Sequence, residues 1–157
     1  MEADPVDVLW EHPRDLDQGL IEEVARVAEA LRAAVGAANR DLCVALVDDA
    51  EIRRLNEQWR GEDKPTDVLS FPVDAEGPEG PVVPLGDIAI SLDTCARQAE
   101  THGWSLAEEL TFLLVHSVCH LLGHDHAELE EAARMRAEED RLLARVAPGQ
   151  RRPPTPY

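Results

Sequence analysis

The stretch LAEELTFLLVHSVCHLLGHDH (residues 106–126) decides how this chain folds, because a long apolar run stands between clear helix start and stop signals. Ser105 and Glu108 form a capping box in front of it, and Gly123 follows its last apolar turn. A helix that is apolar on most of its sides is buried in the interior. We therefore predict a central, buried helix of about four turns, which ends near Gly123.

Three histidines mark the end of this run in the pattern HxxxHxxGxxH. His116 and His120 are four residues apart, so their rings project from the same face of the predicted helix. Gly123 lets the chain turn, and His126 follows three residues later. Three imidazoles with an open fourth position are typical of a catalytic zinc site. We predict one zinc ion per chain, held by His116, His120 and His126, although copper or nickel would also bind such ligands.

Strand and helix patterns alternate on either side of the central helix. Short apolar runs predict strands at residues 6–10, 42–48, 67–73 and 85–91, and helical spacing predicts helices at 16–35, from Asp48 or Asp49 onward, at 91–102 and at 127–146. This alternation is typical of an α/β fold. We predict an α/β fold (α+β-like), with one layer of about four mostly parallel strands and an antiparallel edge. Helices, including the central histidine-bearing helix, pack against this layer.

Length and composition indicate one globular domain. The chain has 157 residues, of which 44% are hydrophobic and 30% charged, so it can bury a core without disulfides. We predict a single domain over residues 1–147 and a disordered, proline-rich tail over 148–157. The first residues carry no signal-peptide pattern, and no apolar run approaches the roughly 20 residues that span a bilayer, so we expect a cytoplasmic protein without a membrane partner.

The net charge of −17 argues against broad, nonspecific binding of nucleic acid, since that mode depends on many lysines and arginines. An RNA partner must therefore be held locally. Arg60 begins a polar loop, and its guanidinium suits a phosphodiester because it can donate two parallel hydrogen bonds. Lys64, the only lysine of the chain, and Thr66 lie in the same loop. We predict that Arg60 can contact a phosphate, with Lys64 and Thr66 as substrate-binding residues beside it.

Two segments together resemble the bacterial rRNA maturation factor YbeY, a family of metal-dependent, single-strand endoribonucleases. They are LNEQWRGEDKPTDVLSFP (55–72) and HSVCHLLGHDH (116–126), with LGDIAIS (85–91) between them. The resemblance implies that the three histidines hold zinc and that Arg60 serves catalysis or RNA engagement. It implies single-stranded RNA as the substrate, above all ribosomal RNA of the small subunit, with ribosomal proteins as further partners and no DNA. The implied role is the maturation and quality control of that subunit.

Two alternatives stay open at this point. Metalloproteases with the pattern HExxHxxGxxH carry a glutamate as general base after the first histidine, and this chain has Ser117 there, which weakens the case for a metzincin-like protease. The other alternative is a noncatalytic, zinc-stabilised adaptor in ribosome assembly. The family typically has glycine, leucine and tyrosine where this chain has Ser117, Cys119 and His124.

Overall fold

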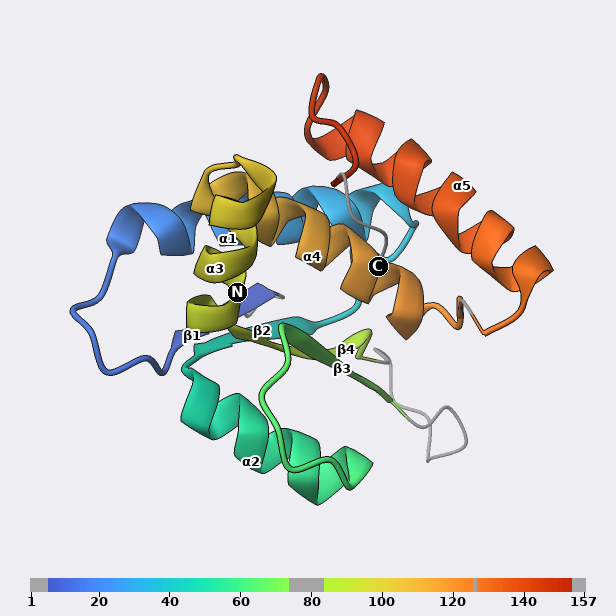
Figure 1. Ribbon diagram of the computed structural model, residues 1–157. Helices are drawn as coiled ribbons and strands as arrows, with labels where there is room; N and C mark the ends of the chain where they lie inside the picture. The colour runs from blue at the N-terminus through green and yellow to red at the C-terminus, as the bar shows by residue number, and fades with distance from the viewer. Residues whose placement is uncertain (1–5, 74–83, 126, 154–157) are drawn as a thin grey trace.

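The computed structural model describes residues 6–73, 84–125 and 127–153 (Figure 1). Its strands are β1 (Val6–Trp10), β2 (Leu42–Val47), β3 (Val68–Pro72) and β4 (Gly86–Ser91). Its helices are α1 (Gln18–Ala34), α2 (Asp49–Arg60), α3 (Leu92–His102), α4 (Leu106–Leu121) and α5 (Leu129–Val146).

The four strands form one sheet in the order β1-β2-β4-β3. β2 is parallel to both β1 and β4, whereas β3 is antiparallel to β4, with Ser70 opposite Ile88. β1 and β2 are joined through helix α1, the kind of crossover connection that parallel strands require. The predicted α/β sheet, mostly parallel with an antiparallel edge, is confirmed.

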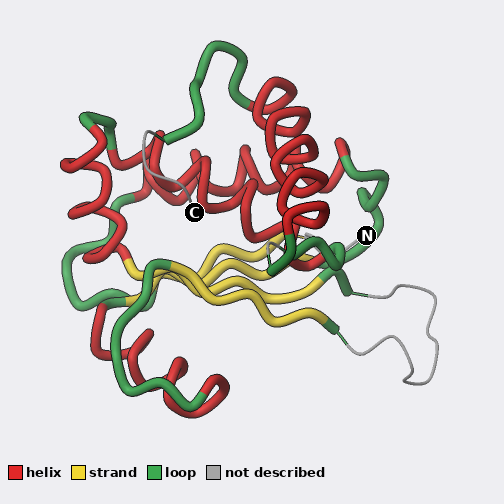
Figure 2. The backbone as a smooth tube through the Cα atoms, turned by 45° about the vertical axis from the view of Figure 1, so that its right-hand side comes forward, coloured by secondary structure: helices red, strands yellow, loops and turns green. Residues whose placement is uncertain are grey.

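Helices cover the two faces of the sheet unequally. In Figure 1, α1, α3, α4 and α5 lie on one side of the sheet and α2 lies alone on the other, and Figure 2 shows the same division from a second direction. α2 packs through a small cluster in which Ile52 meets Val47, Leu69 and Ala89. Part of the α2-side face is therefore left without a helix over it.

The central helix α4 is buried along most of its length, as predicted. Phe112, Leu113, Leu114 and Val118 have no exposed surface, and the predicted capping box between Ser105 and Glu108 is formed. With 16 residues α4 is shorter than the roughly 20 that cross a bilayer. Throughout the described ranges, no helix is long and apolar enough to span a membrane.

Two large apolar residues whose helical spacing matches the inward faces of α2 and α5 are exposed. Trp59, at the end of α2, is 61% exposed, and Leu129, the first residue of α5, is 91% exposed. Both lie at helix ends, and Trp59 contacts Phe71 of β3 edge to face. Helical spacing by itself therefore does not predict burial at a helix end.

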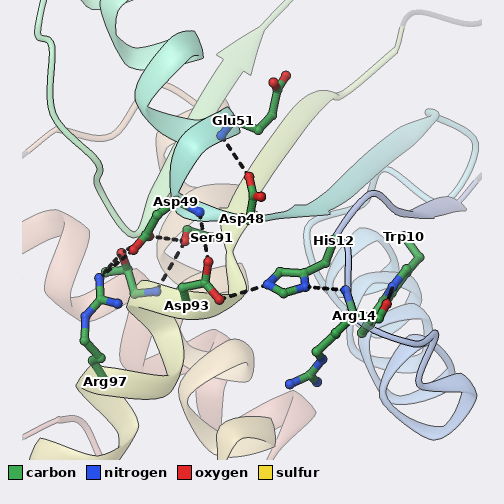
Figure 3. A network of polar contacts seen from close by, with 10 residues as sticks. Trp10, His12, Arg14, Asp48, Asp49, Glu51, Ser91, Asp93 and Arg97 are labelled. Carbon is green, nitrogen blue, oxygen red and sulfur yellow. Dashed lines mark hydrogen bonds and ion pairs between the residues drawn. The ribbon is translucent and has the colours of Figure 1, made fainter.

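A network of polar side chains fills the carboxyl ends of the parallel strands (Figure 3). Asp93 accepts hydrogen bonds from His12 Nε2 at 2.8 Å and from the backbone N–H of Asp49 at 3.0 Å. The Asp49 carboxylate accepts from Ser91 and Arg97. Burial raises the pKa of Asp49, but these hydrogen bonds outweigh it and lower the pKa overall. Ligands of α/β proteins often bind at this end of the sheet. In this protein, side chains that hydrogen-bond to one another occupy that end. His116 and His120 lie elsewhere, beside β3.

The segment after α5 folds back onto the helices. Gln150 donates to the backbone oxygen of Glu108 at 2.9 Å, and Arg152 binds Glu139 and Asp140, each at 2.8 Å. Gln150 and Arg152 thus contact α4 and α5, and the disorder of the tail 148–157 as a whole stays a prediction. Residues 154–157 lie outside the described part, as does most of the acidic loop between β3 and β4.

Candidate histidine centre

His116 and His120 lie on the last turns of α4 and face a pocket of about 540 Å³. Their Nε2 atoms are 3.2 Å apart, and the rings meet edge to face. The i,i+4 spacing brings them together, and the approach of α4 to β3 places them against the sheet edge. The pocket is lined by Arg60, Asp67, Val68, Ser70, Pro72, His116, His120, Gly123, His124 and Asp125.

The other nitrogen of each ring is held by an acceptor. His116 Nδ1 lies 2.6 Å from Glu139 Oε2, and His120 Nδ1 lies 3.1 Å from the backbone oxygen of His124. A carboxylate and a carbonyl oxygen can only accept, so each Nδ1 carries the proton. In the neutral rings each Nε2 therefore presents a lone pair, and both lone pairs lie at the same point of the pocket.

This arrangement fits a metal ion. When both rings are neutral with the proton on Nδ1, the two Nε2 atoms, 3.2 Å apart, are placed to share one cation. Nitrogens bound to one tetrahedral zinc ion at about 2.0 to 2.1 Å are roughly 3.3 to 3.4 Å apart, close to the separation seen here. Metal-binding histidines commonly donate their second N–H to a carboxylate or a carbonyl, as both rings do.

The third predicted ligand, His126, lies outside the described residues. Within the ranges that the structure describes, no group of three or more His, Cys, Asp or Glu side chains is placed to hold a metal ion. The two imidazoles of α4 are thus the described part of the predicted set, and the role of His126 stays a prediction.

Arg60 reaches the same pocket from the opposite face of the sheet. It is the last residue of α2, and Gly61 ends the helix in a left-handed conformation with φ of 71°. Arg60 Nη2 donates to the backbone oxygen of Ser70 on the edge strand β3 at 3.1 Å. The structure therefore unites Arg60 with His116 and His120, although more than fifty residues separate them in the sequence.

Lys64 and Thr66 do not line the pocket. The Lys64 ammonium is 3.3 Å from Glu62 and its side chain is 68% exposed, while Thr66 donates to Asp67 at 3.4 Å. Asn56 anchors the loop by donating to the backbone oxygen of Lys64. Substrate binding by Lys64 and Thr66 stays a prediction.

Ser117 does not line the histidine pocket. It is fully buried, and its Oγ has no hydrogen-bond partner among the described residues. Cys119 is buried as well, and burial, with the nearby Glu139 charge, raises the pKa of its thiol to about 12, which keeps the sulfur protonated and unreactive. Of the three positions that differ from the family pattern, only His124 borders the pocket.

Sequence reasoning missed Glu139, a buried carboxylate on α5 that is 4% exposed. Burial raises its pKa, but hydrogen bonds from His116 and Arg152 outweigh burial and lower the pKa, so the group is ionised. Arg152 also lies over the ring of Phe112, which stacks on His116. A signal was present in the sequence: Glu139 lies four residues after Met135 and three before Leu142, within the apolar stripe of α5.

We expect Glu139→Gln to weaken zinc binding about 10- to 100-fold, because the ring of His116 loses the carboxylate that orients it and raises its basicity. The dissociation constant is measured by competition with a chromophoric chelator on metal-free protein. Glu109→Gln is the matched control, since Glu109 is equally buried and binds His102 Nδ1 at 2.8 Å away from the pocket. Equal losses of zinc affinity in both variants would reduce Glu139 to a general structural role.

The fold and the pocket define a class: an α/β protein with two oriented imidazoles and an arginine at one accessible site, the parts of a hydrolytic centre. Comparison with known proteins identifies the family. The family model of endoribonuclease YbeY matches residues 11–147, so the chain belongs to the endoribonuclease YbeY family. This identifies it as a hydrolase that acts on RNA, and the protease and adaptor alternatives are not favoured.

Individual relatives agree with this assignment. The endoribonuclease YbeY of Moorella thermoacetica is 46% identical over 135 residues, which cover 81% of this chain and 86% of that protein. The endoribonuclease YbeY of Thermus thermophilus is 45% identical over 129 residues, 81% of this chain and 91% of that protein. The solution structure of TM1509 from Thermotoga maritima superposes with a TM-score of 0.59 at 25% identity, and the match covers 93% of this chain and 99% of that one.

Proposed function

We propose that this protein cleaves single-stranded RNA in the cytoplasm, in the maturation and quality control of small-subunit ribosomal RNA, with one zinc ion held by His116, His120 and His126. One observation carries the proposal. The Nε2 atoms of His116 and His120 converge at 3.2 Å in the pocket that Arg60 also lines. Family membership supports RNA as the substrate.

Each described residue has a definite task in this proposal. Glu139 and the His124 carbonyl hold the two imidazole rings so that both Nε2 atoms face the ion. A bound zinc ion would supply Lewis-acid polarisation of a phosphoryl oxygen. Arg60 holds the phosphate and neutralises the charge that grows on it as the bond breaks. Its bond to Ser70 uses Nη2, and a guanidinium carries further N–H donors for the phosphate.

The net charge of −17 limits where on the protein RNA can bind. Most of the surface repels a phosphate backbone, so binding depends on the positive charge of Arg60 and the metal ion in the pocket. Affinity for RNA is therefore local and sensitive to the loss of either group. We propose no DNA partner.

The test combines metal analysis with cleavage of defined RNA. Protein purified without chelator is expected to carry one zinc per chain, and to cleave a single-stranded RNA faster than the same sequence in a duplex. Chelation should stop cleavage, and added zinc should restore it. Cleavage that survives complete removal of metal would contradict the zinc assignment. Binding to the small ribosomal subunit without any RNA cleavage would instead favour the adaptor, and peptide cleavage would favour the protease.

A further inference from the structure

A second cavity, of about 700 Å³, lies between α2 and the strands, on the side of the sheet that no described helix other than α2 covers (Figure 1). It runs along the open strand surface beside α2, and we call it the sheet groove. Its lining is mostly apolar and includes Leu9, Ala45, Trp59, Phe71, Asp87 and Ile88. Neither the predicted ligands nor the proposed chemistry accounts for it.

Exposed aromatic side chains form one wall of the sheet groove. Trp59 is 61% exposed and meets Phe71 edge to face, with ring centroids 6.1 Å apart. Leu9, across the sheet on β1, is 42% exposed. An accessible indole beside an apolar floor is a surface on which a flat ring can stack, and unpaired nucleobases bind proteins in this way.

The sheet groove is continuous with the histidine pocket. Arg60, Ser70 and Pro72 line both cavities. Arg60 crosses the edge strand β3 and binds the Ser70 carbonyl, so its guanidinium lies at the boundary between them. A phosphate held by Arg60 thus has the histidines on one side and the aromatic wall on the other.

Charge decides which part of a nucleotide the sheet groove accepts. Asp87 lines it beside Cys43, and burial together with the charges of Asp87, Asp7 and Glu11 raises the pKa of the Cys43 thiol. This acidic end repels a phosphate. It accepts hydrogen bonds from the amino groups of bases, as carboxylates do from cytosine.

We propose that the sheet groove binds an unpaired nucleobase that flanks the phosphate held by Arg60, stacked against Trp59 and Phe71. This inference rests on the proposed function, because it takes single-stranded RNA as the substrate. It also supplies a physical basis for single-strand selectivity. A base must leave its partner to enter the groove, so a duplex bears the cost of unpairing before it reaches the histidines.

The test compares Trp59→Ala and Trp59→Phe on short, fluorescein-labelled single-stranded RNAs. One RNA is intact, and the others each carry a single abasic nucleotide at successive positions around the cleavage site. Dissociation constants come from anisotropy and KM values from cleavage, and melting curves confirm that the variants fold. Trp59→Ala is expected to raise Kd and KM about 5- to 100-fold on intact RNA, in line with the loss of one base stack. Trp59→Phe should retain most of the binding, because the phenyl ring can still stack.

The abasic series separates stacking from a merely structural effect. One abasic position should raise the Kd of the parent protein by the same factor, and on that RNA Trp59→Ala should raise Kd no further. The inference is overturned if Trp59→Ala leaves Kd unchanged on intact RNA. It is also overturned if Trp59→Ala raises Kd by the same factor on every abasic RNA as on intact RNA. Because binding is read separately from cleavage, a parent that binds RNA without cleaving it contradicts the proposed function alone.

Discussion

Arg60→Ala is expected to lower the rate of RNA cleavage about 10²- to 10³-fold while the protein keeps its zinc and its fold. The guanidinium is assigned to the phosphate, and within the protein it donates a hydrogen bond to the Ser70 carbonyl at 3.1 Å. Its removal therefore takes charge stabilisation from the transition state and leaves the imidazoles in place. Single-turnover cleavage of a defined single-stranded RNA, with zinc content measured on the same sample, tests both halves of the statement.

Arg54→Ala is the matched control, because Arg54 lies on the same helix but is exposed and pairs with Glu51. Its cleavage rate should stay close to that of the parent. Arg60→Lys should recover only part of the activity, since an ammonium keeps the charge but loses the planar, two-pronged geometry. If Arg60→Ala cleaves as fast as the parent, Arg60 does not stabilise the transition state and the proposed mechanism is wrong.

His120→Ala is expected to abolish stoichiometric zinc and, with it, cleavage. One of the two described Nε2 donors disappears, and the remaining imidazoles cannot fill the coordination that a tightly bound zinc ion requires. Elemental analysis of protein purified without chelator measures the loss directly, and activity is a second readout.

His12→Ala is the control for His120→Ala, since His12 binds Asp93 in the polar network at the carboxyl ends of the parallel strands and does not line the histidine pocket. That variant should keep one zinc per chain. An unchanged metal content in His120→Ala would count against the site, whatever its effect on activity.

The sequence predicts those features that local signals determine. The central helix follows from its apolar run and from the capping box at Ser105 and Glu108, and the i,i+4 spacing of His116 and His120 alone brings their rings together. The mostly parallel sheet follows from alternating patterns and from the rules for parallel connections. Trp59 is different, because helical spacing alone does not show that the fold leaves it 61% exposed beside Phe71 of β3.

The rest of the candidate site depends on contacts between distant segments. Arg60 was singled out by its loop and by the resemblance, but only the fold shows that it crosses β3 to meet the histidines. Glu139 was missed because an acidic residue on a charged helix is usually solvated, and its partner His116 lies 23 residues away. His126 follows Gly123 by three residues in the sequence, and its role as third ligand stays a prediction.

The bond between Arg60 and Ser70 also bears on how this protein behaves at high concentration. β3 is an edge strand of the described sheet, and an open edge offers its carbonyls to strands of other molecules. Arg60 occupies one of these carbonyls with a charged group, and Pro72, which lacks an N–H, ends the strand. The residue assigned to the phosphate therefore also occupies one hydrogen-bonding position of the open edge, where another strand would otherwise pair.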